Sequence, residues 1–287
     1  MDPVMSLLNP LPAQVDHLIQ LALAEDVGTG DVTTMACISP DTVTAARVLA
    51  KEVLVLAGMP FFRRVFEMLD PQVEVNTLFP DGTLIPPGTV VAQLYGPARS
   101  ILIGERTALN IIQRLSGTAT VTRRWVEAVD GTRARVCDTR KTTPGMRFMQ
   151  KYAVAVAGGS NHRFGLDSGV LIKDNHIAAC GSLAEAVQRC RRAAPHLLKV
   201  EVEVVDMAMV DQAIAADADV ILLDNMSTEM MIEAVQRIRG LAPRILIEAS
   251  GGLTLDRARE VASTGVDLLS VGALTHSAPS ADLSLDF

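Results

Sequence analysis

Six short aliphatic segments recur after Gly131, and helical patterns separate the later ones. The segments are ARVCD (134–138), GVLIKD (169–174), KVEVEV (199–204), DVILLD (219–224), RILIEAS (244–250) and DLLSVG (267–272). Helical periodicity covers 182–193, 206–216, 227–239 and 254–264, and Ser182 with Glu185 has the pattern of a capping box. Strands that alternate with helices over short loops form parallel sheets. We therefore predict an α/β fold. Six or seven such units with one active face, and no G-x-G-x-x-G after a strand, favour an α/β barrel, complete or incomplete, over a doubly wound sheet.

The N-terminal part of the chain has a different pattern. Residues 14–24 and 60–69 read as helices, and β-branched segments between 43 and 103 are divided by Pro-Asp-Gly, Pro-Pro-Gly and Gly-Pro turns. This pattern predicts a small α+β domain with an antiparallel sheet. Residues 105–130 read as two helices interrupted at Ser116-Gly117, and we place the domain boundary near this point.

Composition excludes several classes of protein. Aromatic residues make up only 3% of the 287, so the core is expected to be aliphatic. A net charge of −7 and few aromatics argue against nucleic acid as a partner. The four cysteines lack metal-ligand spacing, no Lys or Arg precedes Arg47, and no apolar run approaches the about 18–20 residues of a membrane span. We expect a soluble, cytoplasmic protein without membrane contact.

A cationic island stands out within this acidic chain. Eight Lys and Arg residues lie between Arg133 and Lys173 against two acids, so this segment carries +6 and the remainder −13. The charged residues lie in the connections between apolar segments, beside Thr, Pro, Gly and Asn. Functional residues are frequent in such loops. The pattern favours a pocket for a multiply anionic small molecule over a solvated basic face.

Polar residues also follow each predicted strand: 138–141, 173–175, Glu203, 224–225, 250–252 and Gly272. In a barrel the loops that leave the strands converge on one mouth, which is where active sites lie. The residues of the six strand ends are therefore expected to form one site.

Glu201 and Glu203 alternate with three valines in one strand. If the valines face the helices, both glutamates point into the barrel, where an unpaired carboxylate is costly. We expect Glu203 to work with Asp224 on the next strand, because two neighbouring carboxylates can hold Mg²⁺ bound to phosphate or stabilise positive charge on a sugar. The glycines of Ser250-Gly251-Gly252 and Val271-Gly272-Ala273 would let backbone N–H groups approach a phosphate.

Lys173 has three possible roles. It could pair with Asp174 or Asp224, or form a Schiff base as in aldolases. The many surrounding cations favour the third role, binding of a polyanion. His162 could be a base, but we favour binding of a substrate carboxylate.

Taken together, these residues resemble the quinolinate phosphoribosyltransferase family. The resemblance spans nearly the whole chain and is carried by EDVGTGDVTT (25–34), ERTALNIIQRLSGTAT (105–120), DTRKTTPGMR (138–147), KYAV (151–154), GGSNHR (158–163), LIKDNH (171–176), EVEV (201–204), LLDNM (222–226), EASGGL (248–253) and TGVDLLSVGALTHS (264–277).

The resemblance implies an N-terminal α+β sandwich domain (1–113), an open α/β barrel of about seven strands (114–274) and a C-terminal tail (275–287) that returns to the first domain. It implies a dimer or a multiple of dimers whose active sites are shared between subunits. The implied reaction joins quinolinate to 5-phosphoribosyl 1-pyrophosphate (PRPP), giving nicotinate mononucleotide, pyrophosphate and CO₂ in NAD biosynthesis. Mg²⁺ enters with PRPP, and no organic cofactor is expected.

The resemblance also implies roles for single residues. Arg140, His162, Arg163 and Lys173 would bind the two carboxylates of quinolinate, together with Arg106 of the neighbouring subunit. Substrate binding would also involve Thr139, Lys141, and the loops Ser250, Gly251, Gly252 and Val271, Gly272, Ala273. Lys141, Glu203 and Asp224 would be catalytic. The two acids would face the ribose and the metal-bound pyrophosphate, with Mg²⁺ held mainly by PRPP.

Two positions depart from the family pattern without removing a charge. Ala157 stands where a glycine is frequent and Gln150 where a glutamate is frequent. Other functions left open are a molybdenum-transport-associated paralogue of the same fold, a salvage enzyme for nicotinate, a Schiff-base aldolase using Lys173 and a non-catalytic anion-binding protein.

Overall fold

The computed structural model describes residues 11–287, which pack into two compact units. The described residues of unit 1 are 11–123, 142–158 and 273–287, and those of unit 2 are 124–141 and 159–272. These units describe how the chain packs. The domain limits after residues 113 and 274 stay a prediction.

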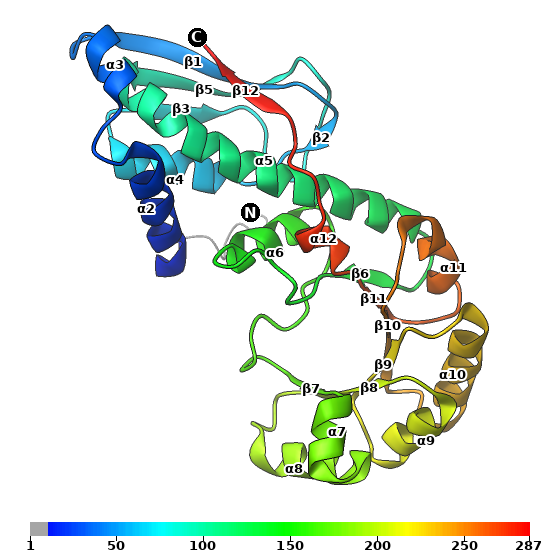
Figure 1. The fold of residues 1–287 in the computed structure, drawn as a ribbon. Helices are drawn as coiled ribbons and strands as arrows, with labels where there is room; N and C mark the ends of the chain where they lie inside the picture. Colours follow the sequence, from blue (N-terminus) through cyan, green and yellow to red (C-terminus); the bar gives the residue numbers. More distant parts are fainter. Residues whose placement is uncertain (1–10) are drawn as a thin grey trace. The chain divides into compact units, whose positions relative to one another are not determined.

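Unit 1 is built on an antiparallel sheet of four strands in the order β12-β1-β5-β3 (Figure 1). The predicted antiparallel sheet and the helices at 14–24 and 60–69 are confirmed, the helices with slightly longer bounds. The strands of unit 1, including a separate β2-β4 pair, are β1 (Val43–Ala50), β2 (Leu54–Val55), β3 (Glu74–Thr77), β4 (Leu84–Ile85), β5 (Val90–Pro97) and β12 (Leu283–Asp286). The helices are α2 (Ala13–Val27), α3 (Val32–Cys37), α4 (Met59–Leu69), most of α5 (Ala98–Ala128), α6 (Arg147–Val156) and α12 (Ala273–His276).

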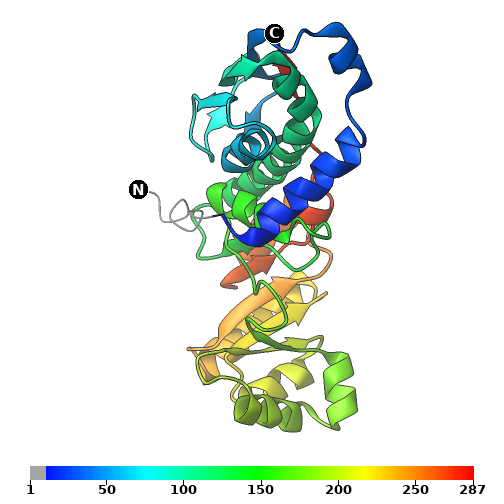
Figure 2. The same cartoon turned by 90° about the vertical axis from the view of Figure 1, so that its left-hand side faces the viewer.

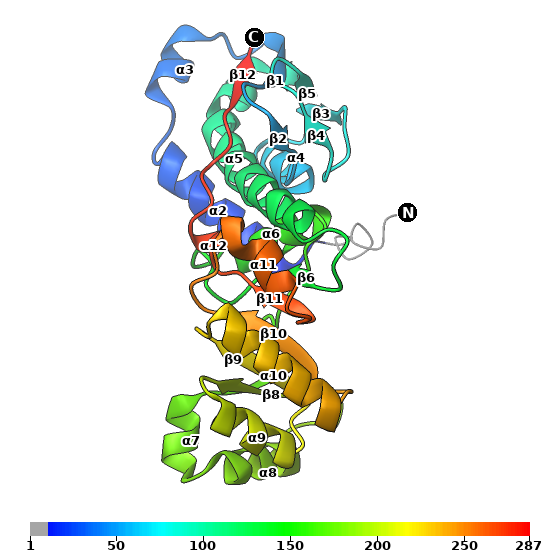
Figure 3. The ribbon, with the colours of Figure 1, turned by 90° about the vertical axis from the view of Figure 1, so that its right-hand side faces the viewer.

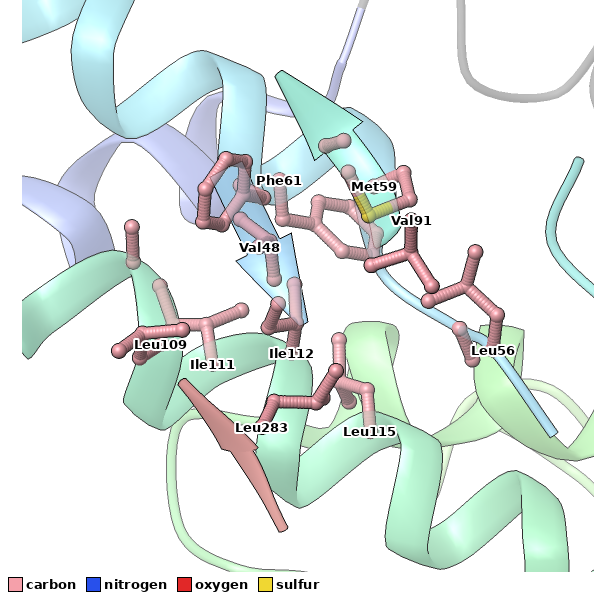
Figure 4. Packing of buried hydrophobic residues seen from close by; sticks show 14 of the residues in the cluster. Val48, Leu56, Met59, Phe61, Val91, Leu109, Ile111, Ile112, Leu115 and Leu283 are labelled. Carbon is pink, nitrogen blue, oxygen red and sulfur yellow. The ribbon is translucent and has the colours of Figure 1, made fainter. Parts of the chain in front are cut away.

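The core of unit 1 contains more aromatic groups than the composition predicts. Phe61, Phe62 and Phe66, three of the seven phenylalanines, all lie on α4 and are fully buried. Phe61 packs edge-on against Tyr152, with the ring centroids 5.3 Å apart. Figure 4 shows Phe61 among aliphatic side chains from β1, β5, α5 and β12. The few aromatic residues are thus concentrated on one amphipathic helix, where large buried side chains contribute most to packing.

The predicted break at Ser116-Gly117 is wrong, because α5 runs without interruption from Ala98 to Ala128. A Cβ atom at Gly117 would lie 1.8 Å from the carbonyl oxygen of Pro279. The hydroxyl of Ser116 accepts a hydrogen bond from the N–H of Ala57 at 3.0 Å. These small residues allow other segments to approach the helix closely, and do not end it.

The C-terminal segment completes unit 1 as an edge strand. The N–H of Ala281 donates to the carbonyl oxygen of Gln113 at 2.9 Å, and Nε2 of Gln113 donates to the carbonyl oxygen of Leu283 at 2.7 Å. Beyond these contacts β12 pairs antiparallel with β1, with Asp286 opposite Arg47.

Unit 2 contains the predicted parallel sheet, with six strands in the order β6-β11-β10-β9-β8-β7. The strands are β6 (Arg135–Cys137), β7 (Val170–Ile172), β8 (Val200–Val204), β9 (Val220–Asp224), β10 (Leu246–Ser250) and β11 (Leu268–Ser270). Consecutive strands β6 and β7 lie at opposite edges, as in a barrel that has not closed. In place of a seventh strand, the described residues show one parallel bridge between Ser160 and Cys137. The α/β class with a separate antiparallel domain is therefore confirmed.

Helices cover one face of this sheet. They are α7 (Asp174–Cys180), α8 (Leu183–Ala193), α9 (Met207–Ala215), α10 (Thr228–Leu241) and, after a 3₁₀ turn η1 (Leu255–Arg257), α11 (Ala258–Ala262). Figure 3 shows the helices in front of the strands, and Figure 2 shows the strands from the opposite side. The N–H of Glu185 donates to Ser182 as the predicted capping box requires, while the Glu185 carboxylate pairs with Arg189 at 2.6 Å.

Two further observations concern the cysteines and the helices. Among residues 11–287 the cysteines form no disulfide. Within the same part of the chain, no helix combines the length and the apolar character that crossing a membrane requires.

Gly117→Ala is predicted to destabilise the protein by about 1–3 kcal/mol, the usual cost of forcing a methyl group into a packed site. The added Cβ would displace the Pro279 carbonyl and the segment that leads into β12. Denaturant unfolding measures the change.

Gly240→Ala is the matched control, since Gly240 also lies in a helix but has no atom within 4 Å of a built Cβ. It should be neutral or stabilise the protein by up to about 1 kcal/mol through helix propensity. Equal effects of the two substitutions would contradict the packing role of Gly117.

Candidate active site

The register of the parallel strands brings their carboxyl ends to one edge of the sheet. Asp224 at the end of β9 pairs with Ser250 at the end of β10, and Glu203 near the end of β8 pairs with Leu222. A cavity of about 420 Å³ lies at these strand ends. It is lined by Thr139, Arg140, Lys141, His162, Arg163, Leu171, Lys173, Glu203, Leu222, Asp224, Asn225, Glu248, Ser250, Gly251, Gly252 and Ser270.

Eleven of the fifteen residues predicted to form the site line this cavity. They are Thr139, Arg140, Lys141, His162, Arg163, Lys173, Glu203, Asp224, Ser250, Gly251 and Gly252. The charged residues predicted to hold two anions and to stabilise a sugar cation are therefore in one place. They are Arg140, Arg163, Lys173, Glu203 and Asp224.

The other four predicted residues do not line the cavity. Arg106 is exposed on α5 of unit 1. Val271 is buried, and its N–H donates to the carbonyl oxygen of Cys137 at 2.9 Å, so this N–H already has a partner within the protein. Gly272 follows it, and Ala273 begins α12.

Four cations of the cavity come from three separate segments. Arg140 and Lys141 follow β6, Arg163 lies in the loop after α6, and Lys173 follows β7. Burial and the neighbouring guanidinium of Arg140 lower the pKa of Arg163, while the carboxylate of Glu201 opposes this shift. The repulsion shows that positive charge is concentrated here, which is the environment that a polyanion requires.

Each cationic loop is held by local hydrogen bonds. The N–H of Lys141 donates to Oγ1 of Thr139 at 3.0 Å, and Nη1 of Arg163 donates to the carbonyl oxygen of Gly169 at 2.9 Å. These bonds limit the loss of conformational freedom that ligand binding would otherwise require.

The acids of the cavity have partners as well. Glu203 forms an ion pair with Lys173, and Asp224 accepts a hydrogen bond from Nδ2 of Asn225 at 2.7 Å. Val200, Val202 and Val204 are buried, while Glu201 and Glu203 both contact side chains that line cavities of the open sheet. The predicted alternation of β8 is therefore confirmed.

The Ser250–Gly252 turn needs glycine for a steric reason. Gly251 has a φ of +79° and Gly252 a φ of +59°, both in the region that side chains disfavour. A Cβ at Gly251 would lie 2.3 Å from Oδ1 of Asn225, whose own N–H donates to the carbonyl oxygen of Ser250. The turn thus packs directly against the end of β9.

Sequence reasoning assigned no role to Glu248 or Ser270, and it included Asp138 and Asn225 only as polar residues at strand ends. Glu248 is 2% exposed in the middle of the aliphatic strand β10, and Ser270 donates a hydrogen bond to it. Asp138 is fully buried and accepts from the N–H of His162 at 2.8 Å. The available signal was a charged residue inside an otherwise apolar strand, which is costly unless it is paired.

His162 and two buried glutamates form a cluster, of which His162 and Glu248 also line the cavity. Nε2 of His162 lies 3.2 Å from Oε2 of Glu201 and 3.6 Å from Oε1 of Glu248. Burial and the charge of Glu201 raise the pKa of Glu248 from its ordinary value of 4.5 to about 7. A second cavity, of about 390 Å³, meets this cluster on its other side, with His162, Glu201 and Glu248 among its lining residues.

Two family models match this chain, and together they cover most of it. The N-terminal domain of quinolinate phosphoribosyl transferase matches residues 31–116, and its C-terminal domain matches residues 118–286.

Named relatives agree with the family models. The probable nicotinate-nucleotide pyrophosphorylase (carboxylating) of Bacillus subtilis is 44% identical over 95% of this chain and 93% of its own. That of Synechocystis is 45% identical over 94% and 92%. The structure of nicotinate-nucleotide pyrophosphorylase from Francisella tularensis superposes with a TM-score of 0.89 at 41% identity, covering 96% of each chain. The chain therefore belongs to the quinolinate phosphoribosyl transferase family.

Proposed function

We propose that this protein transfers the phosphoribosyl group of PRPP to quinolinate and removes one carboxylate as CO₂. The products are nicotinate mononucleotide, pyrophosphate and CO₂, a step of NAD biosynthesis. The observation that carries the proposal is the single cavity in which Arg140, Lys141, Arg163 and Lys173 surround the acids Glu203 and Asp224.

The cations solve the problem of bringing two anions together. A pyridine dicarboxylate and a polyphosphate repel each other, and at about 4 Å the repulsion of two unit charges near a protein surface amounts to several kcal/mol. Guanidinium groups suit carboxylates because they donate two parallel hydrogen bonds, and ammonium groups suit phosphates as compact charges. We assign Arg140, Arg163 and Lys173 to quinolinate, and Thr139, Lys141 and Lys173 to PRPP. Both ring nitrogens of His162 face groups of the protein, so His162 would serve quinolinate through its bond to Arg163.

Glu203 and Asp224 would act on the sugar. The pyridine nitrogen attacks the anomeric carbon as the bond to pyrophosphate breaks, and positive charge develops on the ribose. Two carboxylates held by Lys173 and Asn225 can stabilise this charge without reorganising during the step. The ring nitrogen is itself the nucleophile, so no Ser, Cys or His nucleophile is required.

Decarboxylation follows from the charge on the ring. Once the nitrogen is quaternary, the bond between the ring carbon beside it and its carboxylate breaks, and the electron pair stays on that carbon. CO₂ leaves, and a proton takes its place on the ring.

Mg²⁺ is expected to enter with PRPP and to reduce the negative charge of the pyrophosphate. Carboxylate oxygens are suitable neighbours for this ion, and both Glu203 and Asp224 line the cavity. We propose that they contact the metal-bound pyrophosphate, while the phosphates provide most of the coordination. The loop Ser250–Gly252 would bind phosphate through backbone N–H groups. In the loop Val271–Ala273 this role would fall to Gly272 and Ala273, because the N–H of Val271 donates to Cys137.

We also propose a cytoplasmic homo-oligomer of at least two subunits. Arg106, which is exposed on unit 1, would complete the site of a neighbouring subunit.

Two alternative functions can be separated by simple assays. In the Schiff-base hypothesis Lys173 must be an uncharged nucleophile, yet it forms an ion pair with Glu203. Borohydride should therefore not trap a substrate on Lys173.

A salvage enzyme would accept nicotinate. We expect pyrophosphate and CO₂ to be released from PRPP with quinolinate, and no pyrophosphate with nicotinate; the opposite preference would refute the proposed reaction.

Arg140→Ala and Lys141→Ala are each predicted to lower turnover by more than about a hundredfold, the usual effect of losing a charge-stabilising donor in an active site. Arg244→Ala is a matched control, because Arg244 is an exposed cation of unit 2 outside the cavity. Pyrophosphate release measures turnover, and circular dichroism verifies the fold. Near-normal turnover in either cavity variant would contradict its assigned role.

Arg106→Ala and Lys173→Ala should each be inactive alone but regain activity when the two proteins are mixed. Random pairing of the subunits gives mixed dimers, and about a quarter of all sites would contain both wild-type residues. Turnover measured after subunit exchange tests the shared site. Full activity of Arg106→Ala alone would show that the site lies within one subunit.

A further inference from the structure

The proposed reaction does not explain Glu201 and Glu248. Glu201 on β8 is 6% exposed and Glu248 on β10 is 2% exposed, whereas the acids assigned to the ribose are Glu203 and Asp224. Two carboxylates buried this deeply are costly unless protons or counter-charges offset them. Glu248 lines the cavity and Glu201 lines the second cavity, so the pair can act on the residues that bind substrate.

The contacts of His162 define the state of its ring. Nδ1 accepts a hydrogen bond from the N–H of Arg163 at 2.8 Å, so this nitrogen carries no proton. The hydrogen of a neutral imidazole is then on Nε2, which faces Glu201 at 3.2 Å and Glu248 at 3.6 Å.

The two glutamates require a proton of their own. They are hydrogen-bonded to each other, and this bond exists only when one of them is protonated. Oε1 of Glu201 is buried with no hydrogen-bond partner among the described residues, so a second negative charge beside it would be poorly solvated. Glu248 also accepts from the hydroxyl of Ser270, and its raised pKa identifies it as the group that holds the proton.

A metal ion is a poorer explanation of the same cluster. The three side chains could in principle surround a cation, since their ligand atoms lie within 4.8 Å of one another. Nε2 of His162 would have to offer a lone pair, and the hydrogen would then move to Nδ1. There it would oppose the N–H of Arg163, which now donates to Nδ1.

We propose that Glu201 and Glu248 are positioning residues that hold His162 as the Nε2–H tautomer and thereby fix the backbone of Arg163. The same segment is held from the other side by Asp138, which accepts from the N–H of His162 at 2.8 Å. The guanidinium of Arg163 lines the cavity. It is thus aligned by a network that begins at Glu248 on β10 and Glu201 on β8. The inference rests on the proposed function only in taking Arg163 as a ligand of the dicarboxylate.

The network also sets the charge behind Arg163. With one proton shared, the two glutamates carry a single negative charge, and the carboxylate of Glu201 favours the charged form of Arg163 against the repulsion of Arg140. Two titratable groups face Glu248. They are Glu201 from β8 and His162 from the loop between α6 and β7. The hydroxyl of Ser270 from β11 faces it as well.

Two substitutions of Glu248 distinguish positioning from mere filling of space. Glu248→Gln keeps a donor for Glu201 and an acceptor for Ser270, so the KM for quinolinate should stay within about threefold of the wild type. Glu248→Leu keeps the approximate volume but neither bond, and should raise this KM by at least about tenfold while the KM for PRPP changes little. Similar kinetics of the leucine variant and the wild type would overturn the proposal, as would an equal rise of both KM values.

The pH profile gives a second readout. Glu248 is protonated below about pH 7 and loses its proton above it, so the wild-type KM for quinolinate should rise as the pH passes from 7 to 9. Glu248→Gln cannot ionise and should not show this additional rise. Identical profiles for the two proteins would contradict a proton on Glu248.

Imidazole ¹⁵N spectra of the ligand-free protein test the tautomer independently of catalysis. His162, assigned by its loss in His162→Asn, should show an unprotonated Nδ1 in the wild type and in Glu248→Gln, and two protonated nitrogens in Glu248→Leu. A protonated Nδ1 in the wild type would overturn the inference whether or not quinolinate is turned over. The expected tautomer in a protein without turnover would instead refute the proposed function alone.

Discussion

Parallel strand register is the constraint on which the rest of unit 2 depends. Asp224 stands beside Ser250, and Glu203 stands beside Leu222, two residues earlier on β9, so the polar ends of the strands lie at one edge. Cations that repel one another would not gather in solution. Here the hydrogen bonds of the sheet and the burial of Val200, Val202 and Val204 offset that cost, because the same strands that carry the charges also form the core.

Charge in the open sheet is arranged in layers. Arg140, Lys141, Arg163 and Lys173 line the cavity with Glu203 and Asp224 among them, and the cluster of Glu201 and Glu248 adjoins it. Along β8 the cavity acid and the cluster acid are only two residues apart, since alternate side chains of a strand share a face. A cation cluster of this kind keeps its geometry because each group has a fixed partner within the protein, and so little reorganisation accompanies binding.

Small residues in unit 1 show how local patterns can mislead. Ser116-Gly117 resembles a helix break, but the glycine admits the backbone of Pro279 and the serine bonds to Ala57. A glycine that lets a remote segment pack against a helix can have the same neighbours in the sequence as a glycine that ends a helix. Likewise, a low aromatic content predicted an aliphatic core, whereas Phe61, Phe62 and Phe66 on one helix make the core of unit 1 partly aromatic.

The amino-acid sequence by itself determined the alternating strands and helices of unit 2, the antiparallel sheet of unit 1, the cationic island and the inward face of Glu203. These features follow from periodicity and from charge at strand ends, which are local properties of the chain. Only the tertiary structure decided that α5 is continuous, that Val271 uses its N–H on Cys137, and that Glu248 meets Glu201 and His162. Those results depend on distances between residues far apart in sequence, and periodicity carries no information about such distances.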